Sequence, residues 1–169
     1  MKSRINNFLR HYFGDEHAAK VLYGVILLFV ALFGLDANRL DSGYLAATET
    51  FIAILAIIIA EDYAELIGFT IKNKRTLSRQ ERNEIFEDTF AIATFCLPPV
   101  FILLLSESGL YKLDTAFNYT FIYCILVIFV FSYWASKLSN LSRLRSIVTA
   151  SIIASIGLAL VYLKSTFGK

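Results

Sequence analysis

The chain has 169 residues, of which 57% are hydrophobic and 18% are charged, and its formal net charge is +2. Its mean hydropathy is +0.61, and it contains 15 Phe and 9 Tyr. A soluble domain of this length has too small an interior for so many apolar side chains, which excludes a soluble fold. We therefore expect an all-α membrane protein whose single transmembrane domain covers residues 1–169.

Five stretches approach or exceed the roughly 20 apolar residues that a helix needs to cross a bilayer. They cover residues 18–35, 44–70, 84–106, 116–136 and 145–164. The first begins after Asp15, Glu16 and His17 and lacks a small-residue cleavage pattern, so we interpret it as a retained helix. The sequence therefore predicts about five transmembrane helices.

The basic residues predict that the N-terminus is inside and the C-terminus outside. In this orientation twelve Lys and Arg lie on the cytoplasmic side and four lie outside, as the positive-inside rule requires. The cytoplasmic set is Lys2, Arg4, Arg10, Lys20, Lys72, Lys74, Arg75, Arg79, Arg82, Lys137, Arg143 and Arg145, and the outer set is Arg39, Lys112, Lys164 and Lys169.

The second stretch carries Glu49 on a line of small residues. At 100° per residue, a narrow arc holds Glu49, Ala53, Ala56, Ala60 and Ala64. A charge inside a bilayer costs about 2.5 to 3.5 kcal/mol on insertion scales and usually faces a partner or water. We predict an ion path that is lined by Glu49, Thr48, Ala53, Ala56 and Ala60. The alternatives are packing within the chain and a neutral, packed acid.

Carboxylates from two stretches are expected to meet at the inner mouth. They are Glu61, Asp62 and Glu65 of the second stretch, which lie on a different face of it from Glu49, and Glu84, Glu87 and Asp88 of the third stretch. Three interpretations stay open: interfacial ion pairs with the basic connector, a vestibule that attracts cations, and a site for a divalent ion. The metal, if any, is unknown.

The third stretch contains Pro98 and Pro99, which remove two backbone donors and predict a kink. The kink acts either as a hinge or as a bend for packing. The fourth, residues 117–134, carries aromatic and β-branched residues on every side, and we expect a lipid-facing outer helix. The fifth contains Ala150-x-x-x-Ala154, a spacing that lets helices approach closely.

The basic loops are candidates for contact with an anionic, nucleotide-type ligand or a cytosolic partner. Their residues are Lys72, Lys74, Arg75, Arg79, Arg82, Lys137, Arg143 and Arg145. The alternative is that they serve topology and anionic-lipid contact.

Nothing in the sequence indicates an enzyme. Cys96 and Cys124 lie in apolar stretches, and the chain has no Cys-x-x-Cys, His-Glu-x-x-His, Walker-type phosphate loop or glycine-rich dinucleotide turn. We therefore expect no enzymatic activity and no cofactor.

Four short motifs resemble a family of small, uncharacterised five-helix bacterial integral membrane proteins. They are Val21-Leu22-Tyr23-Gly24-Val25-Ile26, Ala60-Glu61-Asp62-Tyr63-Ala64-x-x-x-Gly68, Leu97-Pro98 and Leu163-Lys164. The resemblance covers nearly the whole chain and implies a five-helix topology in a bacterial inner membrane. Members often have His where this chain has Glu61. The organisation is also similar to that of membrane effectors of anti-phage defence, which implies a pore under the control of a soluble partner or ligand.

Three functional hypotheses follow. The first, which we favour, is an oligomeric ion channel in which the second stretch lines a pore between copies. The second is a proton or divalent-metal transporter that uses Glu49 and the inner carboxylates. The third is a non-conducting membrane subunit whose basic loops dock a cytosolic partner.

Overall fold

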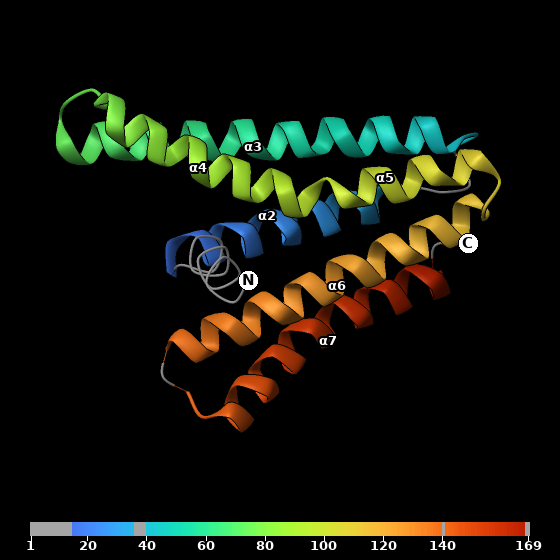
Figure 1. Ribbon diagram of the computed structural model, residues 1–169. Helices are drawn as coiled ribbons and strands as arrows, with labels where there is room; N and C mark the ends of the chain where they lie inside the picture. The colour runs from blue at the N-terminus through green and yellow to red at the C-terminus, as the bar shows by residue number, and fades with distance from the viewer. Residues whose placement is uncertain (1–14, 36–39, 140, 168–169) are drawn as a thin grey trace, which may run out of the picture.

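The computed structural model describes residues 15–35, 40–139 and 141–167, and this part of the chain is helical without strands. The elements are α2 (Asp15–Gly34), α3 (Gly43–Asn73), α4 (Arg79–Cys96), α5 (Pro98–Leu105), the short 3-10 helix η1 (Ser106–Ser108), α6 (Leu113–Leu138) and α7 (Arg143–Phe167) (Figure 1). The predicted all-α class is confirmed, and each expected stretch overlaps a helix.

The helix α2 is the centre of the packing. It contacts α3 and α4 on one side and α6 on the other, while α7 packs mainly on α6. Val21, Val25, Leu28 and Leu32 recur at helical spacing along α2, and all four are buried. Figure 1 shows α3 with α4 and α5 on one side of the molecule and the α6–α7 pair on the other.

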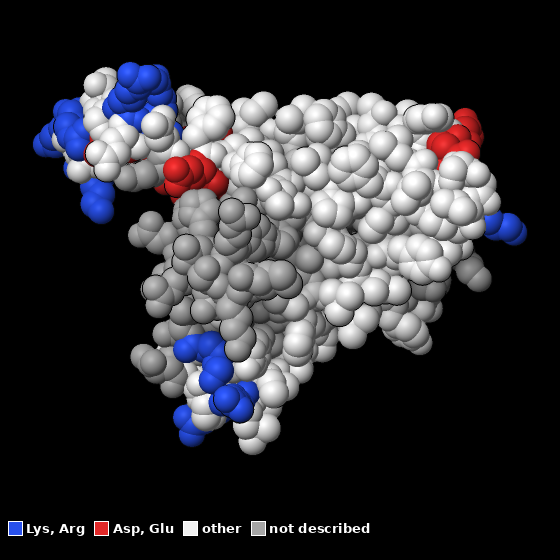
Figure 2. Space-filling view, in the orientation of Figure 1, with Lys and Arg blue, Asp and Glu red and all other residues white. Residues whose placement is uncertain are grey.

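The helices alternate in direction, so their connections gather at two ends. The start of α2, the α3–α4 connector and the α6–α7 turn lie at one end, on the left of Figure 1. We call it the basic end, because Lys and Arg of the connector and of the α6–α7 turn colour it blue in Figure 2. Acidic groups and a basic group mark the opposite end (Figure 2).

Within the described residues, three helical stretches are long and apolar enough to cross a membrane: Gly43–Asn73, Arg79–Ser108 and Leu113–Lys137. A shorter apolar stretch, Ala18–Gly34, belongs to α2. Length and composition thus indicate a membrane protein. That α2 and α7 also cross the bilayer, which makes five spans, stays a prediction.

The predicted interruption at the two prolines is confirmed. Helix α4 ends at Cys96 and α5 begins at Pro98, with Leu97 between them in a helical backbone conformation. Leu97 N still donates to the carbonyl of Ala93, at 2.9 Å. Helical hydrogen bonding therefore reaches the break, where Pro98 and Pro99 supply no backbone donor, and Figure 1 shows the ribbon changing direction between α4 and α5. Whether the break acts as a hinge stays a prediction.

A tyrosine of α6 satisfies a carbonyl that the proline leaves free. The carbonyl of Phe95 lies four residues before Pro99, which has no N–H to donate to it. The hydroxyl of Tyr123 donates to this carbonyl instead, at 3.0 Å. An unpaired carbonyl in hydrocarbon is costly. This bond therefore stabilises the contact of α6 with the proline break between α4 and α5.

The prediction that the fourth stretch is a lipid-facing outer helix is wrong. In α6, 44% of the most apolar window is buried inside the protein, against 33% in the two other long stretches. The aromatic rings point inward: Phe121 meets Phe29 edge to face at 5.6 Å between centroids, and Phe131 meets Phe95 at 4.9 Å. Aromatic residues around a whole helix fit a core as well as they fit lipid.

The small residues of α7 pack within the chain. Ala150 and Ala154 are buried. A Cβ placed on the buried Gly157 would lie 3.4 Å from the side chain of Ile125 in α6. The small residues thus bring α7 close to α6.

The bond to the proline-freed carbonyl can be tested by removing one hydroxyl. We expect Tyr123→Phe to lower the free energy of unfolding in detergent micelles by about 1 to 3 kcal/mol, because the Phe95 carbonyl loses its donor. Tyr119→Phe is the matched control, since Tyr119 lies on the same helix and is exposed. Equal stability of the two variants would contradict this role of Tyr123.

Candidate functional site

A charged cluster lies where α2, α3 and α4 meet at the basic end. Lys20 of α2 donates to Glu65 Oε2 of α3 at 2.7 Å, and it also forms an ion pair with Asp88 of α4. The side chains of Lys20 and Asp88 are only 23% and 11% exposed. One ammonium group therefore links three helices in a partly buried setting, where a charge-assisted bond is stronger than at an open surface.

Two more carboxylates of α3 adjoin this cluster. Thr89 of α4 donates to Asp62 Oδ1 at 2.5 Å. Glu61 is half-buried, and its Oε2 is buried without a hydrogen-bond partner among the described residues. Glu61 lies within electrostatic range of Lys20, Glu65 and Asp88. In the described part of the chain, four carboxylates and the Lys20 ammonium group thus lie near one another, and two of these carboxylates pair with it.

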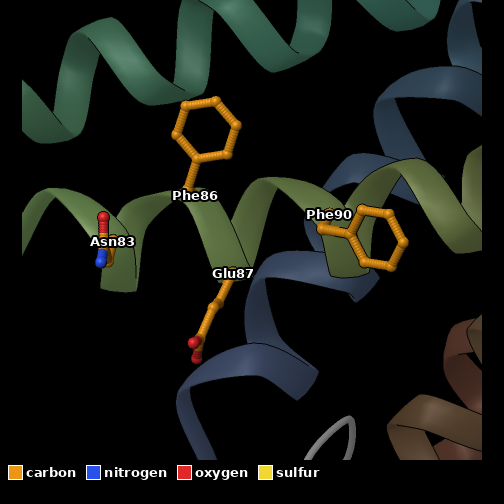
Figure 3. A pocket seen from close by; sticks show the side chains of 4 residues that line it. All are labelled: Asn83, Phe86, Glu87 and Phe90. Atoms are coloured by element: carbon orange, nitrogen blue, oxygen red, sulfur yellow. The ribbon is translucent and has the colours of Figure 1, made fainter.

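The predicted acidic cluster is only partly assembled. Glu61, Asp62, Glu65 and Asp88 are brought together. The side chain of Glu84 lies outside the described residues, and Glu87 is exposed. Figure 3 shows Phe86 pointing toward α3 and Glu87 pointing away from it. Among the described side chains, no group of three or more His, Cys, Asp or Glu is placed to hold a metal ion.

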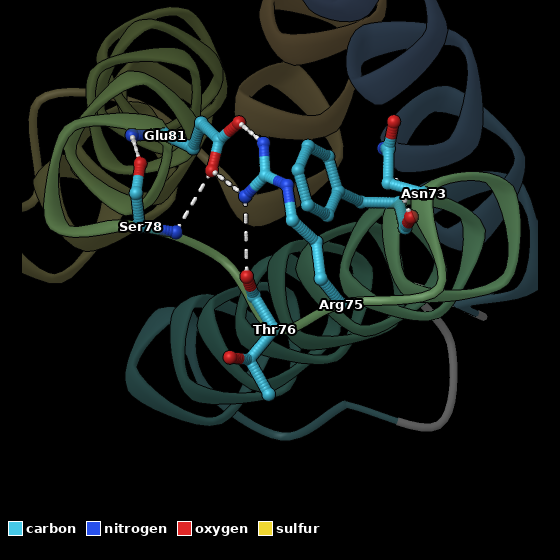
Figure 4. A network of polar contacts seen from close by, with 6 residues as sticks. Asn73, Arg75, Thr76, Ser78 and Glu81 are labelled. Atoms are coloured by element: carbon cyan, nitrogen blue, oxygen red, sulfur yellow. Dashed lines mark hydrogen bonds and ion pairs between the residues drawn. The ribbon is translucent and has the colours of Figure 1, made fainter.

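One base of the connector pairs locally. The guanidinium of Arg75 forms two bonds to the Glu81 carboxylate, at 2.9 and 2.6 Å, and lies 4.9 Å from the centroid of the Phe69 ring (Figure 4). Glu81 also accepts from Ser78 N at 2.8 Å, which completes a capping box at the start of α4. The bond to Glu81 raises the pKa of Arg75. Arg75 is therefore engaged in the fold, and its charge is neutralised.

The remaining predicted basic residues are mostly free of protein partners. Within the described residues no hydrogen bond or ion pair joins them to an acid, and all but the half-buried Lys137 are exposed. They are Lys72, Lys74, Arg79, Arg82, Lys137, Arg143 and Arg145. Among the described side chains, Glu65 and Asp88 thus pair with Lys20 of α2, and no ion pair joins an inner acid to a connector base.

The face of α3 that carries Glu49 is separate from the packed face. Glu49 and Ala53 are half-buried, whereas Ala56 and Ala60 are exposed. In the described part of the chain no side chain bonds to the Glu49 carboxylate. Thr48 is exposed and donates to the carbonyl of Tyr44 at 2.7 Å, so its hydroxyl is already used. The side chains of the predicted path residues are therefore exposed or half-buried on the outer surface of the single chain.

Lys20 and Thr89 are the residues that sequence reasoning missed. Lys20 entered only as a charge that sets the orientation. Its signal is its position: it follows Ala18 and Ala19 inside an apolar stretch, at the same end as the acids of two other helices. A Lys at that depth needs an anionic partner or a path to water.

No family model matches the chain, and no curated protein or solved structure matches it either. The resemblance to five-helix bacterial membrane proteins therefore stays a prediction.

A double-mutant cycle measures how strongly Lys20 couples α2 to α4. We expect Lys20→Met and Asp88→Asn to be destabilising singly and to show a coupling free energy of about 1 to 3 kcal/mol, because each change removes one side of the same partly buried ion pair. The measurement is the free energy of unfolding in detergent micelles.

The control cycle uses Arg75→Met and Glu81→Gln, which break the connector pair, whose side chains are 54% and 26% exposed. Its coupling should be smaller, because solvent screens that pair. A Lys20–Asp88 coupling no larger than that of the control would contradict the cluster's role in joining the helices.

Proposed function

We propose that this protein is a multi-span membrane protein that conducts ions through a passage between copies, with α3 on the path. The observation that carries the proposal is the position of Glu49. It is a carboxylate inside an apolar helix, without a partner among the described residues, on the edge of a face that the chain's own core leaves open. An intramembrane acid in this setting is a functional group by default.

The length of α3 allows the depth of Glu49 in the membrane to be proposed. The helix has 31 residues, which corresponds to about 46 Å, whereas the hydrocarbon layer is about 30 Å thick. Glu49 lies near the start of α3, and Glu61 and Glu65 lie three to four turns later, at the basic end. We place Glu49 in the outer half of the membrane and the Lys20 cluster at the inner boundary. This orientation follows from the bases gathered at one end (Figure 2).

Small residues next to Glu49 support a passage between copies. Ala56, Ala60 and Ala64 are exposed in the single chain and leave room along the helix. Several copies of α3 around an axis would bring their Glu49 side chains into a ring, and a ring of carboxylates favours cations. Water in the passage would also solvate the charge, which removes the cost of holding it in hydrocarbon.

Flux through purified protein in liposomes tests this proposal. We expect passive cation flux, and we expect Glu49→Gln to reduce it by about tenfold or more, since each ~1.4 kcal/mol of lost stabilisation costs a factor of ten in rate. Asp114→Asn is the matched control, because Asp114 is an exposed acid at the same end of the molecule but on α6. Native flux that Glu49→Gln leaves unchanged would contradict the proposal.

The Lys20 cluster favours a second candidate, a proton-coupled transporter. Ionisable groups from three helices meet there, and Glu61 has a buried carboxylate oxygen without a protein donor among the described residues. Such chains of groups carry protons in pumps and transporters. For this candidate we expect saturable uptake driven by a pH gradient, which Glu61→Gln abolishes and Glu49→Gln preserves. Rapid, non-saturable flux would exclude it.

A further inference from the structure

A groove lies between α3 and α4 beside the basic connector. Its volume is about 380 Å³. Its walls combine apolar side chains of both helices and of the connector with one base and one acid. The lining residues are Ile59, Asp62, Tyr63, Leu66, Leu77, Arg82, Ile85 and Phe86.

The groove exposes large apolar side chains next to a strongly basic loop. Phe86 is 72% exposed and Tyr63 is 63% exposed, and Figure 3 shows the Phe86 ring on the side of α4 that faces α3. Leu66 is also exposed. Contiguous apolar surface of this kind, rimmed by charges, is typical of a site that another molecule covers.

The base and the acid of the groove lie at different levels along the helices. Arg82 and Leu77 lie toward the connector, whereas Asp62 and Ile59 lie further along the helices toward the apolar stretch. Asp62 already accepts a bond from Thr89. Arg82 is exposed and has no hydrogen bond or ion pair to another described residue, in contrast to Arg75, which Glu81 neutralises. The unpaired positive charge of Arg82 therefore lies at the connector end of the groove, next to its apolar walls.

We propose that this groove binds one anionic phospholipid, whose phosphate contacts Arg82 and whose acyl chain lies along Ile59, Tyr63 and Leu66. The exposed Lys72, Lys74 and Arg79 add positive charge around the headgroup. Basic pockets between transmembrane helices on the cytoplasmic side hold anionic headgroups in this way. The inference is independent of whether the protein conducts ions.

The place of the groove along the helices selects a lipid over a soluble partner. Beyond Glu61 in α3 and Thr89 in α4, both helices become predominantly apolar, so the groove opens at the level where hydrocarbon gives way to headgroups. A lipid reaches this site without leaving the bilayer. Its phosphate would then lie at the level of Arg82 and its acyl chain at the level of the apolar walls. A soluble anion would match Arg82 alone.

The test is lipid retention by the purified full-length protein, measured by native mass spectrometry from micelles that contain equal amounts of phosphatidylglycerol and phosphatidylcholine. We expect the native protein to retain phosphatidylglycerol preferentially. Arg82→Gln should weaken this retention about fivefold, the effect of one basic residue near an anionic surface. Leu66→Trp, which fills the groove and leaves the charge unchanged, should also lower it.

Lys112→Gln is the matched control, because it removes an exposed base at the opposite end of the molecule and should leave retention unchanged. Helical content by circular dichroism shows that each variant is folded. Equal retention of both lipids would overturn the proposal. So would equal losses in Arg82→Gln and Lys112→Gln, which would indicate diffuse charge, or a loss that follows Arg145→Gln instead of Arg82→Gln, which would place the lipid at the α6–α7 turn.

Discussion

The contact of Lys20 with Glu65 and Asp88 fixes how the first three helices meet at the basic end. Each of these groups would be expensive at the edge of hydrocarbon if it stood alone. Together they neutralise one another, and they require α2 to lie against both α3 and α4. The core of Val21, Val25 and Leu28 continues this contact into the apolar layer. The order of the helices around α2 depends on it.

This arrangement gives α3 two faces with different tasks. One face packs through Ala46, Thr50 and Ile54 and ends in the charged cluster. The other carries Glu49 and the exposed Ala56 and Ala60, and the helices of the described residues leave it largely uncovered. Because the packed face is complete without Glu49, the fold supplies no reason for an acid there. The proposed passage between copies does supply one.

The sequence predicts the positions of the helices along the chain well, but it predicts poorly which helices pack against each other. Apolar length and the breaks between stretches locate α3 and α6 to within a few residues, and the residues Pro98 and Pro99 mark the interruption correctly. Lys20 was missed because its role depends on which helices are adjacent, and apolar periodicity does not predict which helices are adjacent. The aromatics of α6 were misplaced because lipid and protein interior select the same side chains. Glu61 and Asp88 were grouped correctly, since their depth follows from position along the helix.

The central claim is that the Glu49 face of α3 meets water inside the membrane. The direct measurement is the rate at which a membrane-impermeant thiol reagent, added outside, modifies Glu49→Cys in a Cys96→Ala, Cys124→Ala background in intact membranes. Phe51→Cys is the comparison, because Phe51 lies at nearly the same depth but about 160° away around the helix, and it is 42% exposed. The account predicts rapid modification at position 49 and slow modification at position 51. Equally slow reaction at both positions would contradict it.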